Sequence, residues 1–185
     1  DNTIVIFFSD NGGVEWYNFS DNGVLRGIKG DFFEGGIRVP FTMQWPKKIK
    51  PGITYDKPII ALDVFATVAS AASAEKYIKN NIDGVDLLPY LTGDKFGLPH
   101  EYLYWKNPDK DIDVVRDERY KYLRIKNDEY IFDLKNDISE ETNIINSSKP
   151  IYDRLKSQFK EWEKGMIDPV FLDLGSGKEY NKLHP

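Results

Sequence analysis

Two short groups of residues have the types and spacing that could do chemistry. The first is Asp10-Asn11, which follows an apolar run at residues 4–8 and precedes two glycines. A carboxylate and an amide carbonyl are hard oxygen ligands of the kind that Ca²⁺ and Mg²⁺ prefer. Because a Ca²⁺ site needs about 6–8 ligands, this pair could supply only part of one. The alternative is a simple turn, since Asx-Gly is a common turn pair.

The second group is centred on Lys29, which lies between Gly27 and Gly30. Glycines let the backbone approach a ligand closely, and a compact ammonium group suits sulfate or phosphate oxygens. The alternative is a solvated loop lysine. Glu34 and Arg38 follow at a spacing that would let them pair, and we expect them to hold the loop in place.

Composition excludes several functional classes. The chain of 185 residues has no cysteine, so disulfides, zinc-thiolate sites and cysteine nucleophiles are absent from it. Its formal net charge of -5 makes it a poor general binder of nucleic acid. No apolar run is long enough to span a bilayer. The chain begins on an apolar strand with no lead-in or secretory signal, so we interpret its start as a truncation point.

The elements that must position these residues are of α/β type. Residues 4–8 predict a strand that is buried on both faces, as in a parallel sheet, and residues 12–36 predict a long functional loop. Residues 37–46 predict a second strand. Residues 60–72 predict a helix, because apolar residues recur there at helical spacing, namely Leu62, Phe65, Val68, Ala69 and Ala72.

The composition changes near residue 98, and strand candidates follow at residues 102–105, 114–116, 120–123 and 130–134. An amphipathic helix begins at Pro150, with Ser148 as its candidate cap. We therefore predict two domains. Residues 1–97 form the C-terminal part of an α/β domain, and residues 98–185 form a small α+β subdomain with a four-stranded antiparallel sheet, one covering helix and a tail.

The order of the motifs is more specific than any one of them. "FFSDNGG" is followed by "LRGIKGDFFEGGIRVPF", then "DGVDLLPYLTG" and "YIFDLKNDISEETNI". Together they resemble the sulfatase family, the formylglycine-dependent branch of the alkaline-phosphatase-like superfamily. Ile138 stands where proline is usual. The resemblance extends to about Gly165 and implies the C-terminal part of an alkaline-phosphatase-like sheet domain, followed by the small subdomain.

The resemblance also implies roles for single residues. Asp10 and Asn11 match the ligands of a divalent metal, usually Ca²⁺, with Mg²⁺ possible, and Lys29 matches the lysine that contacts the substrate's sulfate. Such enzymes hydrolyse sulfate esters, as on glycans or aryl groups, by attack of a hydrated formylglycine on sulfur. Family resemblance favours a periplasmic or secreted location.

The catalytic nucleophile of such an enzyme is absent from this chain. No cysteine or serine stands in a Cys/Ser-x-Pro/Ala-x-Arg motif, and the paired aspartates and catalytic histidines are missing too. We expect these groups, formylglycine included, in a missing N-terminal half. Without that half we expect an inactive chain that self-associates through exposed apolar strands. Two alternatives stay open: a non-catalytic sulfated-sugar binding module or partner subunit of the same fold, and a related phosphatase or phosphodiesterase.

Two sets of residues receive no catalytic role. We expect His100 to be a surface histidine rather than a residue of a substrate cleft. We expect the strand aromatics to make core and cross-strand contacts rather than to stack on sugar rings. They are Tyr102, Tyr104, Trp105, Tyr120 and Tyr122.

Overall fold

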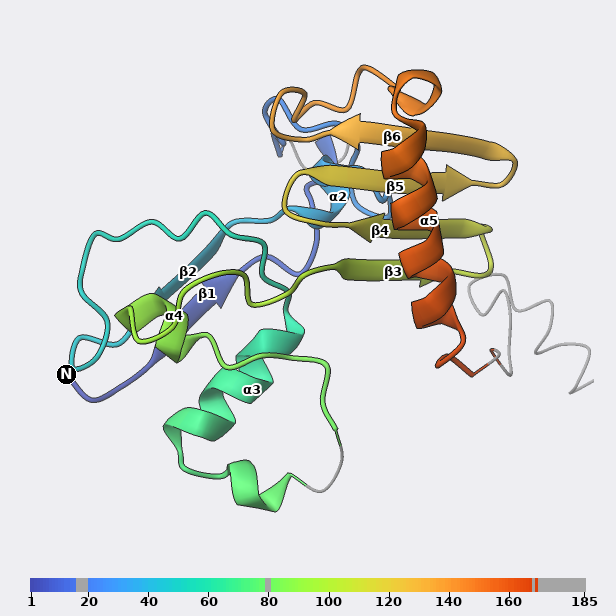
Figure 1. Ribbon diagram of the computed structural model, residues 1–185. Coiled ribbons are helices and arrows are strands. Elements are labelled where there is room, and N and C mark those ends of the chain that lie inside the picture. Colours follow the sequence, from blue (N-terminus) through green and yellow to red (C-terminus); the bar gives the residue numbers. More distant parts are fainter. Residues whose placement is uncertain (16–19, 79–80, 168, 170–185) are drawn as a thin grey trace, which may run out of the picture.

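The computed structural model describes residues 1–15, 20–78, 81–167 and 169 (Figure 1). The tail that the sequence places after residue 168 therefore lies almost wholly outside the described residues. The first part of the chain contains β1 (Val5–Phe8), α2 (Glu34–Ile37), β2 (Phe41–Gln44), α3 (Leu62–Ala71), η1 (Glu75–Tyr77) and α4 (Leu88–Thr92). The second part contains β3 (Leu103–Asn107), β4 (Ile112–Arg116), β5 (Tyr120–Ile125), β6 (Asp128–Asp133), η2 (Ile145–Ser147) and α5 (Lys149–Glu163).

The four strands of the second part form one antiparallel sheet in the order β3-β4-β5-β6. The hairpin between β4 and β5 pairs Arg116 with Lys121. Its turn is closed by Asp117, whose Oδ1 accepts the backbone N–H groups of Arg119 at 2.7 Å and Tyr120 at 2.6 Å. Aspartate favours such turns because its side chain bonds to the backbone just ahead. The predicted fold class is confirmed.

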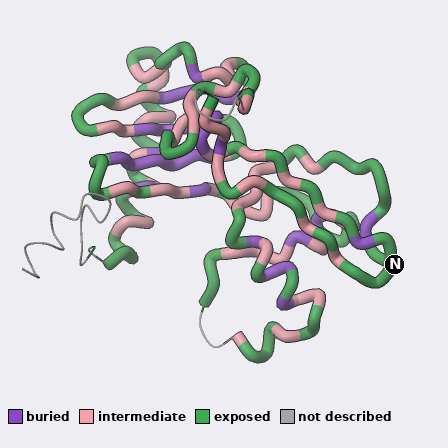
Figure 2. The backbone as a smooth tube through the Cα atoms, turned by 180° about the vertical axis from the view of Figure 1, so that it is seen from behind, coloured by how far each residue is buried: buried purple, intermediate pink, exposed green. Residues whose placement is uncertain are grey.

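Both faces of this sheet are covered, since successive residues of a strand point to opposite sides. On one face α5 packs Leu155 and Phe159 against Tyr122 and its neighbours Val115 and Ile131. On the other face Phe32 and Phe33, which immediately precede α2, pack against a cluster formed by Ile112, Val114, Leu123, Phe132 and Leu134. Buried residues concentrate in these strands (Figure 2). The sequence predicted one covering helix but not the second cover.

Helix α5 begins where Pro150 predicts, with Pro150 in its first turn. Ser148 occupies the predicted cap position, but its side chain makes no capping hydrogen bond. Its backbone carbonyl instead accepts the N–H groups of Ile151 and Tyr152, both at 3.0 Å. The strand aromatics belong to the packing, as predicted: Tyr122 is 2% exposed, and Tyr104 stacks on Trp162 with ring centroids 4.9 Å apart.

The first part of the chain departs from two predictions. Strand β1 pairs antiparallel with β2, and Phe7 is 72% exposed, so the prediction of burial on both faces is wrong for this chain. Among the described residues β1 pairs with β2 alone, and the exposure of Phe7 shows that this side of the strand is not covered. The predicted strand at residues 37–46 is shorter, because Ile37 ends the helical turn α2 and Arg38 N–H bonds to Glu34 O at 2.7 Å.

Helix α3 lies where it was predicted but buries a different face. Leu62, Phe65 and Val68 of the predicted apolar stripe are 45–59% exposed, whereas Asp63 and Thr67 are almost fully buried. Buried polar groups need partners. Asp63 accepts N–H groups from Ile60 at 2.9 Å and Val85 at 2.8 Å, and Thr67 accepts the N–H of Leu87 at 3.0 Å.

His100 contacts the same carboxylate, contrary to its predicted position on the surface. Its Nε2 lies 2.8 Å from Asp63 Oδ1, and only 11% of its side chain is exposed. The prediction of a surface histidine is therefore wrong. A fully buried carboxylate requires donors from every side, and the imidazole supplies one of them. His100 thus joins the segment before β3 to α3.

Candidate functional site

The turn after β1 carries two side chains with oxygen ligands, Asp10, which is exposed, and Asn11, which is half-buried. Ser9 donates its hydroxyl to Asn11 O at 2.7 Å and its N–H to Pro40 O at 3.2 Å, which fixes the turn against the residue before β2. Asn11 Nδ2 donates to Gly12 O at 2.9 Å, so its Oδ1 faces away from that bond. Asp10 is exposed and has no hydrogen-bond partner among the described residues. Both side-chain oxygens are available to a hard cation.

Lys29 is exposed on a tight turn. Ile28 N–H donates to Asp31 Oδ2 at 3.0 Å, and Asp31 N–H donates back to Ile28 O at 2.9 Å. Gly27 and Gly30 flank the lysine with φ values of +87° and +89°, a region that residues with a Cβ rarely adopt. The glycines around Lys29 therefore serve the turn itself.

These two turns are in direct backbone contact. Gly12 N–H donates to Gly36 O at 3.0 Å, and Lys29 N–H donates to Gly13 O at 3.2 Å. The approach is so close that a Cβ on Gly12 would lie 1.7 Å from Gly35 O. The structure thus brings together the backbones that carry Asp10, Asn11 and Lys29, and the glycines of both motifs are the reason that they fit.

Asn22 joins the same two turns through its side chain. Its Nδ2 lies 3.1 Å from both Gly13 O and Gly27 O, and its Oδ1 accepts the N–H of Gly13 at 2.9 Å. Sequence reasoning missed this residue. The available signal was an asparagine inside a Gly-rich loop, where a side-chain amide can replace backbone partners.

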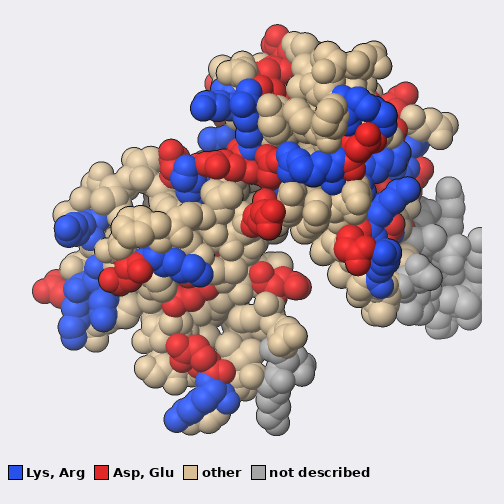
Figure 3. Space-filling view, viewed as in Figure 1, with Lys and Arg blue, Asp and Glu red and all other residues tan. Residues whose placement is uncertain are grey.

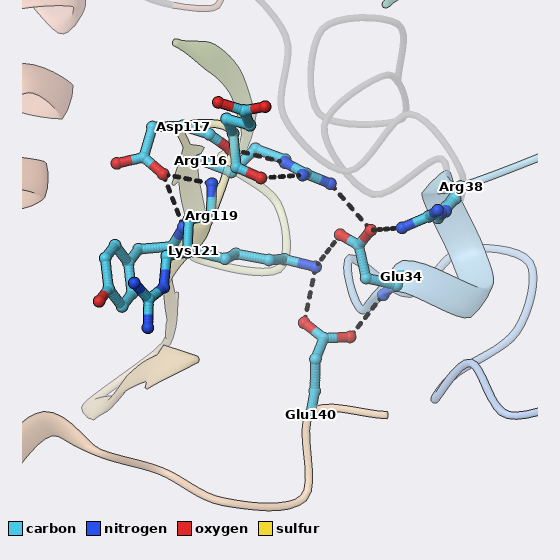
Figure 4. Close-up of polar contacts among 9 residues, drawn as sticks. Glu34, Arg38, Arg116, Asp117, Arg119, Lys121 and Glu140 are labelled. Carbon is cyan, nitrogen blue, oxygen red and sulfur yellow. Dashed lines mark hydrogen bonds and ion pairs between the residues drawn. The ribbon is translucent and has the colours of Figure 1, made fainter. Parts of the chain in front are cut away.

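A buried group of charges anchors the Lys29 loop to the four-stranded sheet (Figure 4). Lys121 on β5 lies 3.1 Å from Glu34 Oε1 and 2.8 Å from Glu140 Oε1, and all three side chains are fully buried. Arg116 on β4 donates to Glu34 Oε2 at 2.9 Å. Arg38, the predicted partner of Glu34, lies 3.9 Å away and is 56% exposed. The predicted pair exists, but it is the weakest member of this cluster.

The surroundings shift the pKa values of Glu34 and Glu140 in opposite directions. Burial raises the pKa of Glu34, but the charges of Lys121 and Arg116 outweigh it, so the net pKa is lowered. Burial also raises the pKa of Glu140, and Lys121 offsets this only partly, so the net pKa stays raised. Sequence reasoning missed Lys121. The signal was its place in the strand, two residues before Leu123 and therefore on the same buried face.

The described residues contain no group of three or more His, Asp or Glu side chains that could hold a metal ion. Asp10 and Asn11 suit a hard cation by donor type, and any such site would need further ligands from outside this group. Acidic and basic side chains are mixed over the sheet and α5 (Figure 3), and this face has no continuous basic surface for nucleic acid. Among the described helices, none has the length and apolar character needed to cross a membrane.

Comparison with known protein families identifies the fold's relatives. The family described as N-sulphoglucosamine sulphohydrolase, C-terminal, matches residues 29–165. The chain belongs to the sulfatase family. An uncharacterized sulfatase of Escherichia coli (strain K12), YdeN, is 37% identical over 135 residues, and the steryl-sulfatase of Mus musculus is 43% identical over 109 residues.

A solved structure agrees over almost the whole chain. The crystal structure of Ps i-CgsB in complex with k-i-k-neocarrahexaose superimposes with a TM-score of 0.81 at 27% identity, covering 98% of this chain and 41% of that one. The matched regions make up 24% of the Escherichia coli relative and 18% of the mouse steryl-sulfatase. Because the matching family model is a C-terminal one, the chain corresponds to the C-terminal region of sulfatases, and it spans less than a quarter of these two relatives.

Proposed function

We propose that this chain is the C-terminal segment of an enzyme that hydrolyses sulfate esters. In this proposal Asp10 and Asn11 are ligands of a divalent cation, Ca²⁺ or Mg²⁺, and Lys29 binds the sulfate group. The observation that carries it is the backbone contact between the two turns, in which Lys29 N–H bonds to Gly13 O at 3.2 Å and Gly12 N–H bonds to Gly36 O at 3.0 Å. The proposed metal ligands and the proposed sulfate ligand thus lie on two turns that are hydrogen-bonded to each other.

The chemistry follows from the charges of these groups. Lys29 places an ammonium group where sulfate oxygens gain negative charge, and such fixed charges stabilise a transition state best where water is excluded. The carboxylate of Asp10 and the amide oxygen of Asn11 hold the cation, which would neutralise charge on the same oxygens. Formylglycine, contributed by an upstream segment, supplies the nucleophile. This chain alone therefore orients sulfate but does not cleave the ester.

A sulfated glycan is the substrate class that we favour. The solved relative with a TM-score of 0.81 was crystallised with k-i-k-neocarrahexaose, a sugar ligand. The phosphonate monoester hydrolase of Agrobacterium radiobacter shares the fold at 24% identity and a TM-score of 0.62, which supports the fold without indicating the reaction. The match of residues 29–165 to the C-terminal family of a sulphohydrolase supports sulfate rather than phosphorus ester chemistry.

The test compares two proteins with an aryl sulfate and a sulfated oligosaccharide as substrates. The chain alone is expected to show no turnover, whereas a polypeptide that joins it to an upstream segment with the Cys/Ser-x-Pro/Ala-x-Arg motif is expected to be active. In the joined protein, Lys29→Ala should lower kcat/KM by about 10²–10³-fold, the usual effect of removing one group that stabilises developing charge. The matched control is Lys50→Ala, which removes another exposed lysine and should have no effect.

Two results would contradict the proposal. The first is turnover by the chain alone that Lys29→Ala abolishes, because the nucleophile would then lie within these residues. The second is full activity of the joined protein after Lys29→Ala. Chelation followed by return of Ca²⁺ or Mg²⁺ tests the metal ligands, since Asp10→Ala should weaken the response to the added ion.

A further inference from the structure

The Lys29 loop is closed on itself by hydrogen bonds at its base and at its tip. Gly35 N–H donates to Arg26 O at 2.6 Å and Gly36 N–H donates to Phe33 O at 2.9 Å, which close the segment at its base. The turn from Ile28 to Asp31 closes its tip. The place of Lys29 therefore depends on where the base of this loop is anchored, as well as on the bond from Lys29 N–H to Gly13 O.

That base is anchored to the small sheet by directional contacts. Glu34 donates its N–H to Glu140 Oε2 at 2.6 Å, and Arg26 donates to the Glu140 carbonyl at 2.8 Å. A third contact reaches the tip, where Lys110 Nζ lies 3.3 Å from Gly30 O. The loop is thus tied to the segment after β6 and to the turn between β3 and β4.

Among the described residues, Lys121 is the cation that both buried carboxylates share. It contacts Glu34 from the loop and Glu140 from the segment after β6, and no part of the three side chains is exposed. Without its charge two carboxylates would face each other in a dry environment, with Arg116 left to balance only Glu34. Figure 4 shows Lys121 reaching from β5 to lie between them. The ammonium group therefore holds the loop and the segment after β6 together.

We propose that Lys121 is a positioning residue for Lys29, acting through Glu34 and Glu140 to fix the Lys29 loop on the small sheet. This inference rests on the proposed role of Lys29 in binding sulfate. Lys121 touches neither the substrate nor the metal in this proposal. It sets the location of the amine that does, and misplacement of a binding group by about 1 Å can lower a rate by about 100-fold.

The first test concerns positioning alone and uses the 185-residue chain. Hydrogen exchange is measured in peptides from residues 25–36 for the wild type and for Lys121→Met. The variant should exchange at least about tenfold faster in this segment, where the N–H groups of Lys29 and Gly35 are bonded, while β6 and α5 keep their protection.

The matched control is Arg124→Met. Arg124 lies on the same strand and also bridges two carboxylates, Asp111 at 2.8 Å and Asp113 at 2.5 Å, but both belong to the sheet or its turn. Its loss should leave exchange in residues 25–36 unchanged. If Lys121→Met fails to fold, Lys121→Met with Glu140→Gln restores the charge balance and is measured instead. Unchanged exchange in residues 25–36, or an equal increase throughout the chain, overturns the proposal.

The second test is a double-mutant cycle in the joined, active polypeptide with an aryl sulfate. Lys121→Met should lower kcat/KM by about tenfold or more when Lys29 is present and by less than about twofold when Lys29 is alanine, because the first residue acts through the second. A merely structural role would lower activity by the same factor in both backgrounds, which refutes positioning. Absence of any effect of Lys29→Ala itself refutes the proposed function instead, and the exchange result still stands.

Discussion

Gly12→Ala tests the close contact on which the candidate site depends. Gly12 is buried, and an added Cβ would lie 1.7 Å from Gly35 O, 2.8 Å from Gly35 C and 2.9 Å from Gly36 Cα. All three neighbours are backbone atoms, so no side-chain rotation can make room. The two turns would have to separate, and the bond from Gly12 N–H to Gly36 O at 3.0 Å would be lost.

The magnitude follows from two contributions. Inserting a methyl group into a tightly packed site reduces stability by about 1–3 kcal/mol. Loss of a backbone hydrogen bond adds about 1 kcal/mol. We therefore expect Gly12→Ala to lower the free energy of unfolding by about 2–4 kcal/mol. The matched control is Gly23→Ala in the same loop, where φ is +62° and no heavy atom lies within 4 Å of the added Cβ. Backbone strain alone should lower the free energy of unfolding of the Gly23→Ala variant by about 1 kcal/mol.

The assay is urea unfolding followed by tryptophan fluorescence, with hydrogen exchange in residues 25–36 as a local measure. Gly12→Ala should lower the urea midpoint and speed hydrogen exchange in residues 25–36. Gly23→Ala should leave exchange in this segment near the wild-type rate. Equal destabilisation by the two variants would refute the reasoning, because the contact between the turns would then contribute nothing beyond backbone strain.

Two further predictions concern acid stability and association. Burial raises the pKa of Glu129, but hydrogen bonds from Lys156, Tyr122 and Tyr152 outweigh it and lower the pKa to about 2. The ionised Glu129 therefore stabilises the fold above the usual carboxyl pKa, and this contribution is lost as the pH falls toward 2. The contribution of Glu129 to the free energy of unfolding is at most about 3 kcal/mol. In the Glu129→Gln variant the urea midpoint should therefore fall less steeply between pH 4.5 and 2.5 than in the wild type. A fall as steep as that of the wild type would contradict the prediction. Leu62 and Phe65 are 53% and 59% exposed, and exposed apolar side chains promote association. Replacing both with serine should reduce self-association of the chain, as measured by light scattering. A wild-type chain that is already monomeric would contradict this prediction.

The sequence predicted the small sheet well because its determinants are local. Alternating apolar residues set each strand, and turn residues such as Asp117 set the hairpins, with the side chain of Asp117 bonding to residues two and three positions ahead. The helix that begins near Pro150 was predicted for the same reason, since its apolar stripe packs on the adjacent sheet. Such features require no knowledge of distant partners.

The errors arise where the partner of a residue lies far along the chain. The spacing of Leu62, Phe65 and Val68 predicts a helix, but it does not indicate that the opposite side buries Asp63 against His100. Likewise Glu34 was paired with Arg38 four residues on, although Lys121 is its partner 87 residues away. Ion pairs between residues far apart in the sequence produce no periodic pattern. A prediction based on spacing therefore pairs a charged residue with a neighbour three or four positions away.

Two kinds of contact hold the Lys29 loop, and they do different things. Phe32 and Phe33 pack on the sheet through apolar surface, which is attractive but has no preferred direction. Those contacts determine that the loop covers this face, and they would tolerate a shift along it. The hydrogen bonds from Glu34 N–H to Glu140 Oε2 and from Lys121 to Glu34 Oε1 have preferred distances and directions, so they favour one position of the loop. A binding group must be held to about 0.5 Å, which apolar packing alone does not ensure. Under the proposed role of Lys29, the buried charges where its loop meets the sheet supply the fixed position that apolar packing alone would not give.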